Sequence, residues 1–241
     1  MSCEFQGINA VKSLVCIPTY NEIENIETII NQVLSVASNL EILVIDDSSP
    51  DGTSEFVKNM ARDDVRIHVL VNPKKNGLGP AYLSGFKWGI SRDYDFFLQM
   101  DADGSHDYKE IDLLLKGAQE NDLVIGSRWI RGGQVINWSI HRKCISIFAN
   151  IYAGLLLNIY VKDSTSGFRI YRKQLLDKIL FHEIQCKGYG FQIEMTKIST
   201  DLGARIIELP ITFKDREQGK SKMDSKIIWE ALRYLHSTKR R

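Results

Sequence analysis

The sequence has no excess of charge of either sign. Its 241 residues contain 31 Lys plus Arg against 30 Asp plus Glu, a formal net charge of +1. Proteins dedicated to binding nucleic acid usually show a strong basic excess, so this composition argues against that class. A hydrophobic content of 44% and an aromatic content of 10% also argue against a disordered acidic chain, because they are enough to form a buried core.

Cysteine is scarce and scattered. The four cysteines, Cys3, Cys16, Cys144 and Cys186, lie far apart and form no CxxC pair. Their spacing therefore indicates neither a zinc site nor a disulfide framework, and it fits a reducing cytosol. Cys16 lies in an apolar run, so we expect it to be an ordinary buried thiol.

The chain has no long uninterrupted apolar run. The longest, 144–161, is broken by Ser146, Asn150, Gly154 and Asn158. A membrane-spanning helix needs about 20 mostly apolar residues, so we expect no transmembrane domain. The N-terminus lacks a basic start followed by an apolar stretch, and we therefore expect no signal peptide.

Two nucleotide-binding motifs are also absent. No GxGxxG follows the first predicted strand, and no GxxxxGK[ST] occurs. Dinucleotide-binding and P-loop functions therefore lose their main support. We find no internal repeat and no low-complexity tract.

Strand and helix patterns alternate along the first 125 residues. The β-rich runs are 13–18, 41–46, 66–71, 95–100 and 122–126. Helical spacing separates them at about 21–34, 53–61, 80–90 and 108–119. In the first of these helices Asn21 and Glu24 form a capping-box pattern. Such alternation predicts an α/β fold with a mostly parallel sheet and helices on both faces.

The pattern changes after residue 126. We expect a loop at 127–139, an amphipathic helix at 141–160 and a polar loop at 162–167. A short strand and helix follow within 168–180, then a helix ending near residue 202, a strand at 205–213, a basic loop at 214–222 and a last helix at 225–236. Charge divides at about the same place: residues 1–125 carry 10 basic and 20 acidic side chains, and 126–241 carry 21 and 10.

Acidic side chains follow three of the predicted strands. They belong to the segments 18–22, 46–53 and 101–106. An extended backbone would point Asp101 and Asp103 to the same side, and such hard oxygens bind Mg²⁺ or Mn²⁺ that also contacts substrate phosphates. The Asp46–Asp47 end fits recognition of the hydroxyls and base edge of a nucleotide better.

Each of these signals also has a structural interpretation. Asp and Ser after strands are common helix N-caps and turn formers, and a lone DxD is weak evidence of a metal site. The two glycines in 76–79 could let the backbone approach a ligand, which is again weak evidence. Three acidic strand ends on one sheet favour a site that binds a nucleotide and a metal, because ligands of such sheets bind at the carboxyl ends of the strands.

Several blocks together resemble one enzyme family. The blocks IPTYNE (17–22), VIDDSSPDGT (44–53), NGLGPAY (76–82) and MDADGSHD (100–107) resemble nucleotide-diphospho-sugar transferases of family 2, which have the GT-A fold. The later blocks are GSR (126–128), GGQVINWSIHRKCISIFAN (132–150), DSTSGFRIYRK (163–173), GYGFQIEM (188–195) and FKDREQGKSK (213–222). In order and spacing these resemble the dolichyl-phosphate (polyprenol monophosphate) mannosyltransferases.

The resemblance implies a reaction and a set of site residues. Mannose would pass from GDP-mannose to a dolichyl or polyprenyl phosphate with inversion at the anomeric carbon. The residues that would hold the nucleotide sugar are Pro18, Tyr20, Glu22, Ile45, Asp47, Asp101, Ala102, Asp103, Ser105, Arg216 and Lys222. Mg²⁺ or Mn²⁺ would lie at Asp101, Asp103 and Ser105. The acceptor phosphate would bind Arg128, Arg142 and Ser146, and Asp103 and Arg128 would be the residues essential to catalysis.

The resemblance also implies how the chain is organised. One GT-A catalytic domain would span 1–241, with the nucleotide-sugar and metal half in 1–125 and the acceptor half in 126–241. The protein would lie in the cytoplasm, peripherally on the cytoplasmic face of a membrane, or reach the membrane through accessory membrane subunits. Two positions depart from the family pattern, Gly104 where Leu is common and Tyr108 where Pro is frequent. These departures leave the exact metal ligands open.

Other functions and roles remain open at this stage. The same fold could use a UDP-sugar, carrying glucose or an aminosugar, with the same kind of lipid phosphate. A sugar nucleotidyltransferase would need a Gly-rich loop with an Arg after the first strand, and 18–22 contains neither. A non-catalytic nucleotide-sugar-binding subunit would not need an intact DxD. The helix at 141–160 could be a core helix or an interfacial one. We expect His106 to be a supporting or capping residue, and Arg169 and Arg172 to be surface groups.

Overall fold

The computed structural model describes residues 11–188 and 190–215. A seven-stranded sheet has the order β3-β2-β1-β4-β7-β5-β8. Its strands are β1 (Ser13–Thr19), β2 (Leu40–Asp46), β3 (Ile67–Val71), β4 (Phe96–Gln99), β5 (Leu123–Ser127), β7 (Arg169–Arg172) and β8 (Ile206–Pro210). All neighbours run parallel except β7, which is antiparallel to both β4 and β5. The α/β class with a mostly parallel sheet is confirmed.

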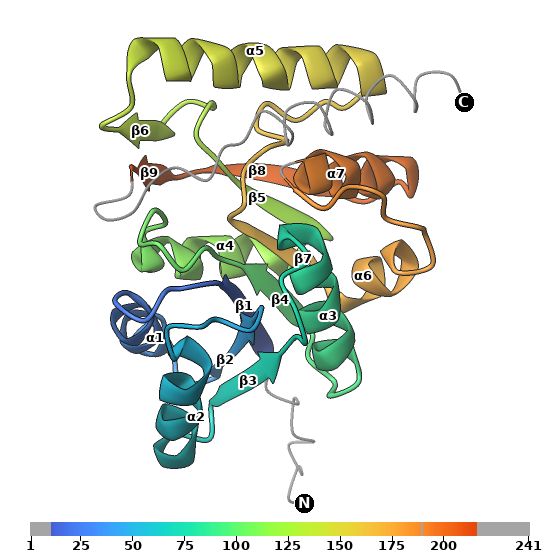
Figure 1. Ribbon diagram of the computed structural model, residues 1–241. Helices are drawn as coiled ribbons and strands as arrows, with labels where there is room; N and C mark the ends of the chain where they lie inside the picture. Colours follow the sequence, from blue (N-terminus) through green and yellow to red (C-terminus); the bar gives the residue numbers. More distant parts are fainter. Residues whose placement is uncertain (1–10, 189, 216–241) are drawn as a thin grey trace, which may run out of the picture.

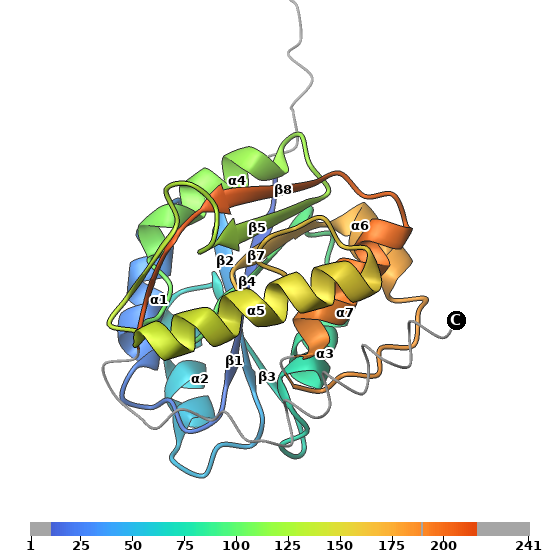
Figure 2. The ribbon, with the colours of Figure 1, turned by 90° about the horizontal axis from the view of Figure 1, so that it is seen from above.

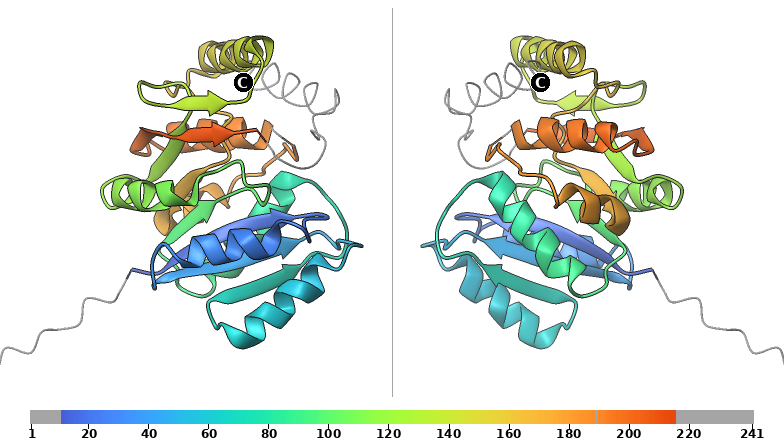
Figure 3. Two further views of the ribbon diagram at one scale, coloured as in Figure 1. Left: turned by 90° about the vertical axis from the view of Figure 1, so that its left-hand side faces the viewer. Right: turned by 90° about the vertical axis from the view of Figure 1, so that its right-hand side faces the viewer.

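Helices cover both faces of this sheet. The helices on one face are α1 (Ile26–Leu34), α2 (Thr53–Asp63) and α4 (Ile111–Ala118), which follows the short 3-10 turn at Tyr108–Glu110. The helices on the other face are α3 (Leu78–Ile90), α6 (Lys173–Ile179) and α7 (Gly190–Asp201). The left view of Figure 3 shows the face with the first group of helices, and the right view shows the face with the second group. Nearly every residue of β1 and β2 is buried, which explains their continuous apolar runs.

A smaller layer lies across one end of the sheet. Strands β6 (Gln134–Ile136) and β9 (Thr212–Lys214) pair in parallel, and α5 (Ile140–Leu157) runs above them, at the opposite end of the molecule from α2 and β3 (Figure 1). Seen from above, α5 crosses in front of the sheet (Figure 2). The predicted loop at 127–139 therefore contains a strand, and the strand predicted at 205–213 divides into β8 and β9. Each segment pairs with a partner distant in the sequence, so neither was visible in local periodicity. Within the described residues, no helix is long and apolar enough to cross a membrane.

The first helix begins later than predicted. Its N-cap is Asn25, and Asn21 has a left-handed backbone with φ of 59°. The loop after β2 takes the Asn21 N–H that a capping box would have used, because Ser49 Oγ accepts from it at 3.0 Å. Thr53 Oγ1 of the same region accepts from the neighbouring Glu22 N at 3.2 Å. The capping-box prediction was wrong because tertiary hydrogen bonds hold this turn in another shape.

Candidate active site

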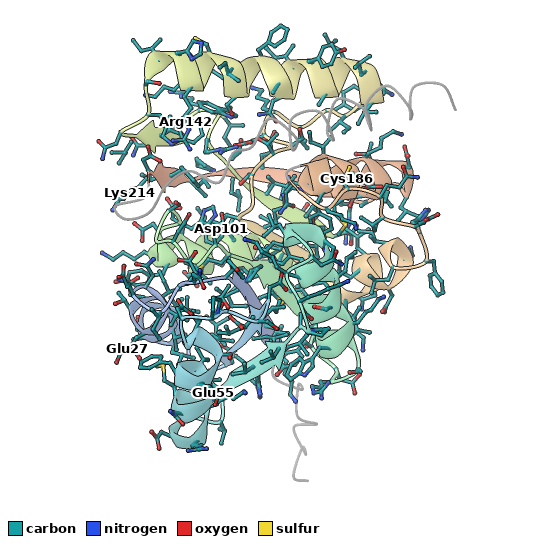
Figure 4. All side chains as sticks on the ribbon, viewed as in Figure 1. Glu27, Glu55, Asp101, Arg142, Cys186 and Lys214 are labelled. Carbon is teal, nitrogen blue, oxygen red and sulfur yellow. The ribbon has the colours of Figure 1, made fainter. Side chains whose placement is uncertain are left out.

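The aspartate pair lies at the carboxyl end of β4, near the middle of the molecule (Figure 4). Asp101 and Asp103 are both partly exposed, whereas Ala102 between them packs into the core. The backbone turns here instead of staying extended, and Asp103 Oδ1 accepts a hydrogen bond from Ser105 N at 3.0 Å. The pair is thus presented by a tight turn that Gly104, with φ of +73°, completes.

Ser105 and His106 lie buried directly behind the pair. The hydroxyl of Ser105 and both ring nitrogens of His106 are buried and have no hydrogen-bond partner within the described residues. His106 Nε2 is 3.5 Å from Asp101 Oδ2, longer than a good hydrogen bond, and its ring stacks on Phe168 with centroids 4.7 Å apart. His106 therefore supports the Asp101 side from behind, as predicted for a supporting residue, and it caps no helix.

The residues predicted to hold a nucleotide differ in their exposure. Pro18, Tyr20 and Glu22 are partly exposed at the end of β1. Asp47 is mostly buried, and its two oxygens accept hydrogen bonds from Asn72 Nδ2 at 2.8 Å and from Asn76 N at 3.3 Å. These bonds tie the end of β2 to the loop that leads into α3.

At the end of β2, the side chains of Ile45 and Asp46 face inward. Ile45 is fully buried in the core under α3, so only its backbone can face a ligand. Asp46 is also fully buried, and its carboxylate accepts from Thr19 Oγ1 at 2.9 Å and from Ser49 N at 2.9 Å. Asp46 therefore fixes the loop, and recognition of a nucleotide at this end stays a prediction for Asp47.

Arg128 follows β5 and is almost completely buried, 8% exposed. Its Nε and Nη2 donate to the two oxygens of Asp163 at 2.7 and 2.6 Å, and Nη2 also donates to Thr165 Oγ1 at 2.9 Å. Burial alone would raise the pKa of the Asp163 carboxyl, but the charge and hydrogen bonds of Arg128 hold it below its ordinary value. Within the described residues, Arg128 Nη1 has no recorded hydrogen-bond acceptor.

Aromatic rings surround the same guanidinium. The ring centroids of Trp129, Trp138 and Phe213 lie 5.6, 5.6 and 5.4 Å from Arg128 Cζ. The indole N–H groups of Trp129 and Trp138 are buried without an acceptor within the described residues. Two unused indole donors and a cationic edge in one place suit a negatively charged ligand.

Arg142 reaches the same cluster from α5. Its Cζ lies 3.9 Å from the ring centroid of Trp138, and its Nη1 donates to Asp215 Oδ1 at 2.8 Å. Ser146 lies one turn further along α5 and is partly exposed. The structure therefore brings Arg128 and Arg142 onto one indole ring, and Figure 4 shows Arg142 on the α5 side of Asp101. Arg216 and Lys222 lie outside the described residues.

The rings of His106 and Phe213 lie between the aspartate turn and Arg128. The His106 ring lies 5.3 Å from the Phe213 ring, centroid to centroid, and Phe213 in turn lies 5.4 Å from Arg128 Cζ. His106 also forms an isolated antiparallel bridge with Phe213. Loop 163–167 borders both ends, because Thr165 contacts Arg128 while a Cβ at Gly167 would lie 3.6 Å from Asp101 Oδ2.

Sequence reasoning missed where several basic side chains lie. Arg169 was predicted to be a surface group, but it is fully buried, because β7 is a central strand. Arg172 is half-buried and donates to main-chain oxygens at the end of α4. Lys75 lies over the ring of Tyr20, with 3.6 Å between Nζ and the ring centroid. No local pattern marks these contacts, since each joins segments far apart in the chain.

The oxygen ligands at this site fit a divalent metal that also binds substrate. Two partly exposed carboxylates, and a buried serine hydroxyl with no described partner, lie within residues 101–105. Mg²⁺ and similar ions are typically held by one or two carboxylates plus substrate phosphates, so a complete protein cage is unnecessary. Within the described residues, no three His, Cys, Asp or Glu side chains converge to form such a cage.

Comparisons with known proteins agree with this arrangement. A model of glycosyl transferase family 2 matches residues 14–180. Undecaprenyl-phosphate mannosyltransferase of Micrococcus luteus is 44% identical over 222 residues, 92% of this chain and 91% of that protein. Polyprenol monophosphomannose synthase of Mycolicibacterium smegmatis is 44% identical over 223 residues, 92% of this chain and 84% of that protein.

Solved structures of lower identity share the fold. The crystal structure of glucosyl-3-phosphoglycerate synthase from Mycobacterium tuberculosis with Mn²⁺, UDP and glucosyl-3-phosphoglycerate has a TM-score of 0.65 at 18% identity, covering 96% of this chain and 77% of that one. The same enzyme with UDP gives a TM-score of 0.69 at 18% identity, covering 95% of this chain and 80% of that one. At this identity the likeness concerns the fold alone, and that fold is GT-A.

Proposed function

The chain belongs to glycosyltransferase family 2, and from this premise we propose that it transfers mannose from GDP-mannose to a polyprenyl (dolichyl) phosphate. The product would be polyprenyl β-D-mannosyl phosphate. The observation that carries the proposal is that an aspartate turn lies on one side of the His106 and Phe213 rings, and the buried Arg128 with the partly exposed Arg142 on the other. Such a site suits a reaction between a nucleotide diphosphate sugar and a second phosphate compound.

The acidic end would bind the donor. Pro18, Tyr20 and Glu22 would contact the guanosine, together with Asp47 and the backbone of Ile45. Arg216 and Lys222 from the basic loop would close over the phosphates. Tyr20 would offer the base one face of its ring, since Lys75 Nζ lies over the other face at 3.6 Å from the centroid.

Asp101 and Asp103 would hold Mg²⁺ or Mn²⁺, with Ser105 beside them. When bound, the metal neutralises the diphosphate and so makes it a better leaving group. Ala102 keeps the turn anchored in the core, and His106 limits how far Asp101 can swing. The protein's own contribution is to hold two carboxylates in a fixed turn at the edge of the sheet.

The basic end would bind the lipid phosphate. Arg128 would present its Nη1 edge, with Arg142 and Ser146 from α5 and the indole donors of Trp129 and Trp138 around it. A phosphate monoester has a second pKa near 6, so at neutral pH the acceptor is already largely dianionic. The chain then needs no general base, and its task is to align an existing nucleophile with the anomeric carbon. Attack on the side opposite the leaving diphosphate inverts that carbon.

The exposed side of α5 supports a peripheral position on a membrane, which we place at its cytoplasmic face. Ile140, Phe148, Ile151 and Leu155 are exposed there, with Leu155 80% and Phe148 69% exposed. Their helix carries Arg142 and Lys143 near its start, where cationic side chains suit anionic headgroups. The acceptor phosphate site on the same helix would then lie within reach of a lipid in the bilayer.

A donor and acceptor screen tests the proposal. Purified protein is incubated with radiolabelled GDP-mannose, UDP-glucose or UDP-N-acetylglucosamine, and with polyprenyl phosphates of different length and saturation, in Mg²⁺ or Mn²⁺. We expect label to enter the lipid phase only from GDP-mannose. Transfer from a UDP-sugar instead would keep the fold and the acceptor but replace the donor.

The aspartate turn gives a sharper test of the same proposal. Asp103→Ala should abolish transfer, with far-UV circular dichroism unchanged because the side chain lies at the surface of the turn. Asp112→Ala, on the exposed side of α4, is the matched control and should transfer at the wild-type rate. Near-normal turnover of Asp103→Ala with Mg²⁺ would remove Asp103 from the metal site.

A further inference from the structure

Arg169 is a fully buried arginine in the centre of the sheet. Its guanidinium donates to three main-chain oxygens: Ser166 O at 2.5 Å, Ser164 O at 2.6 Å and Gln192 O at 3.0 Å. It also donates to Thr196 Oγ1 at 2.8 Å. Arginine is rarely buried so completely unless its charge is compensated. The function proposed above assigns this side chain no role.

Arg169 forms no direct ion pair with a described carboxylate. Asp163, which feels its charge, is already held by two donor atoms of the Arg128 guanidinium. The carboxylate of Glu208 lies beside Asp163, because it accepts a hydrogen bond from Asp163 N at 2.9 Å. Hydrogen bonds to main-chain oxygens therefore take the place of a paired carboxylate around the Arg169 guanidinium.

Two of the three carbonyls that Arg169 holds, those of Ser164 and Ser166, belong to loop 163–167. Asp163 and Thr165 of this loop orient the Arg128 guanidinium, and Gly167 packs beside Asp101. Asn150 of α5 binds the same loop, because Ser164 Oγ donates to Asn150 Oδ1 at 2.9 Å. Arg169 grips the loop on both sides of Thr165, so it fixes the segment that connects the acceptor arginine to the aspartate turn.

We propose that Arg169 is a positioning residue for the acceptor. By holding Ser164 O and Ser166 O, it keeps Asp163 and Thr165 in place and so fixes the Nη1 edge of Arg128 towards the lipid phosphate. This inference rests on the proposed function. It assigns Arg169 no contact with either substrate.

Two substitutions separate position from charge. Arg169→Met removes both the bonds and the charge. Arg169→Lys keeps the charge, but its single ammonium nitrogen cannot reproduce the planar fork. Arg172→Met is the matched control, since Arg172 lies on the same strand and binds carbonyls of α4, on the opposite face and away from the site.

Each variant is measured for acceptor kinetics at saturating GDP-mannose and for GDP affinity in Mn²⁺ by calorimetry, which also gives the active fraction. A displaced reacting group costs about 100-fold. We expect kcat/KM for the lipid phosphate to fall about 100-fold in both Arg169 variants, with the dissociation constant of GDP changed less than about threefold. Arg172→Met should match the wild type in both quantities after correction for active fraction.

Three results would overturn the proposal. In the first, both Arg169 variants have the same acceptor kcat/KM as Arg172→Met. In the second, Arg169→Lys has the acceptor kcat/KM of the wild type. In the third, GDP affinity falls by the same factor as acceptor kcat/KM. If neither Arg169 variant folds, Thr196→Val tests the proposal instead. This substitution removes the Thr196 hydroxyl that accepts from Arg169 Nη1 and leaves the arginine charge in place. It should lower acceptor kcat/KM about tenfold, as supporting residues typically do, and an unchanged value rejects the idea. If the wild type makes no lipid-linked mannose, the proposed function fails instead.

Discussion

Asp163 illustrates how much a single buried side chain decides in this site. Its carboxylate accepts hydrogen bonds from three atoms of Arg128, including Arg128 N at 2.9 Å, and it is completely buried. A carboxylate in such a place is stabilising only while it is ionised and paired. Its energetic role can therefore be measured separately from catalysis.

The pairing predicts a dependence of stability on pH. The folded pKa of Asp163 lies below the ordinary value of about 3.9, so its contribution is present above that pH and is lost as the pH falls through the folded pKa. At pH 7, Asp163→Asn should lower the free energy of unfolding by about 3 kcal/mol. Urea unfolding of both proteins should show this difference constant from pH 8 to 5 and shrinking below pH 4.

The control for this prediction is Asp112→Asn. Asp112 pairs with Lys116 on the exposed side of α4, and such pairs contribute about 0.5 kcal/mol or less. If the free energies of unfolding of wild type and Asp163→Asn differed by the same amount down to pH 3, this result would contradict the buried ion pair.

The glycines at 77 and 79 owe their identity to packing against another segment. A Cβ at Gly79 would lie 2.7 Å from Cys186 O and 2.8 Å from Phe191 Cδ2, and Gly77 has φ of +106° with Lys187 O close by. Glu194 holds the same segment by accepting from Cys186 N at 2.7 Å. The sequence suggested a close approach of ligand here, and the approach that the structure shows is that of residues 186–187.

This packing makes Gly79→Ala destabilising. The added methyl has no room, because main chain and a buried aromatic ring lie on two sides, and overpacking costs about 1–3 kcal/mol. Thermal unfolding should show the loss, whereas Ser84→Ala in the same helix, which removes only a bond to Ala81 O, should change stability by less than about 0.5 kcal/mol. Equal stability of the two variants would mean that residues 186–187 move aside for the added methyl group at little cost.

At the scale of elements, α5 combines the two roles that its sequence left open. Asn150, Ala153 and Leu157 are buried, so one side is a core helix. Phe148, Ile151 and Leu155 form an exposed apolar side of the same helix. The sequence predicted an amphipathic helix, but apolar residues lie on both its buried and its exposed side. Packing on the rest of the chain determined which of them stay exposed.

This division predicts how α5 supports membrane binding. Phe148→Glu combined with Leu155→Glu should lower affinity for anionic vesicles by at least about tenfold, since each apolar side chain gains about 1.5–3 kcal/mol on burial. Vesicle flotation measures the effect. Val65→Glu, an 87% exposed position beside α2, is the control and should float as the wild type does. Unchanged flotation of the α5 variant would mean that the exposed apolar side of α5 does not contribute to membrane binding.

At the scale of the whole molecule, the two halves of the sequence share one sheet. β7 comes from the second half, yet it lies between β4 and β5 of the first half. The acidic first half forms the aspartate turn, and the basic second half supplies Arg128 and Arg142. The near-zero net charge is thus the sum of two opposed regions that meet in one site.

The shared sheet predicts cooperative unfolding. Without β7, strands β4 and β5 would have no hydrogen-bonded neighbour between them, so neither half should persist alone. Circular dichroism and tryptophan fluorescence should give coincident urea transitions, and GDP with Mn²⁺ should shift both midpoints equally. Separate transitions would mean that 1–125 and 126–241 are independent units.

The sequence by itself determined the alternation of strands and helices, the buried Cys16 and the position of the aspartate turn. These follow from local chemistry, because apolar periodicity and turn residues act over a few neighbours. Only the tertiary structure decided that β7 enters the sheet antiparallel and that β6 pairs with β9. It also buried Arg169 and Asp46, placed Asn25 instead of Asn21 at the helix start, and brought Arg128 and Arg142 onto Trp138. Each of these depends on hydrogen bonds or contacts between residues far apart in the chain, and such contacts leave no periodic signal in the sequence.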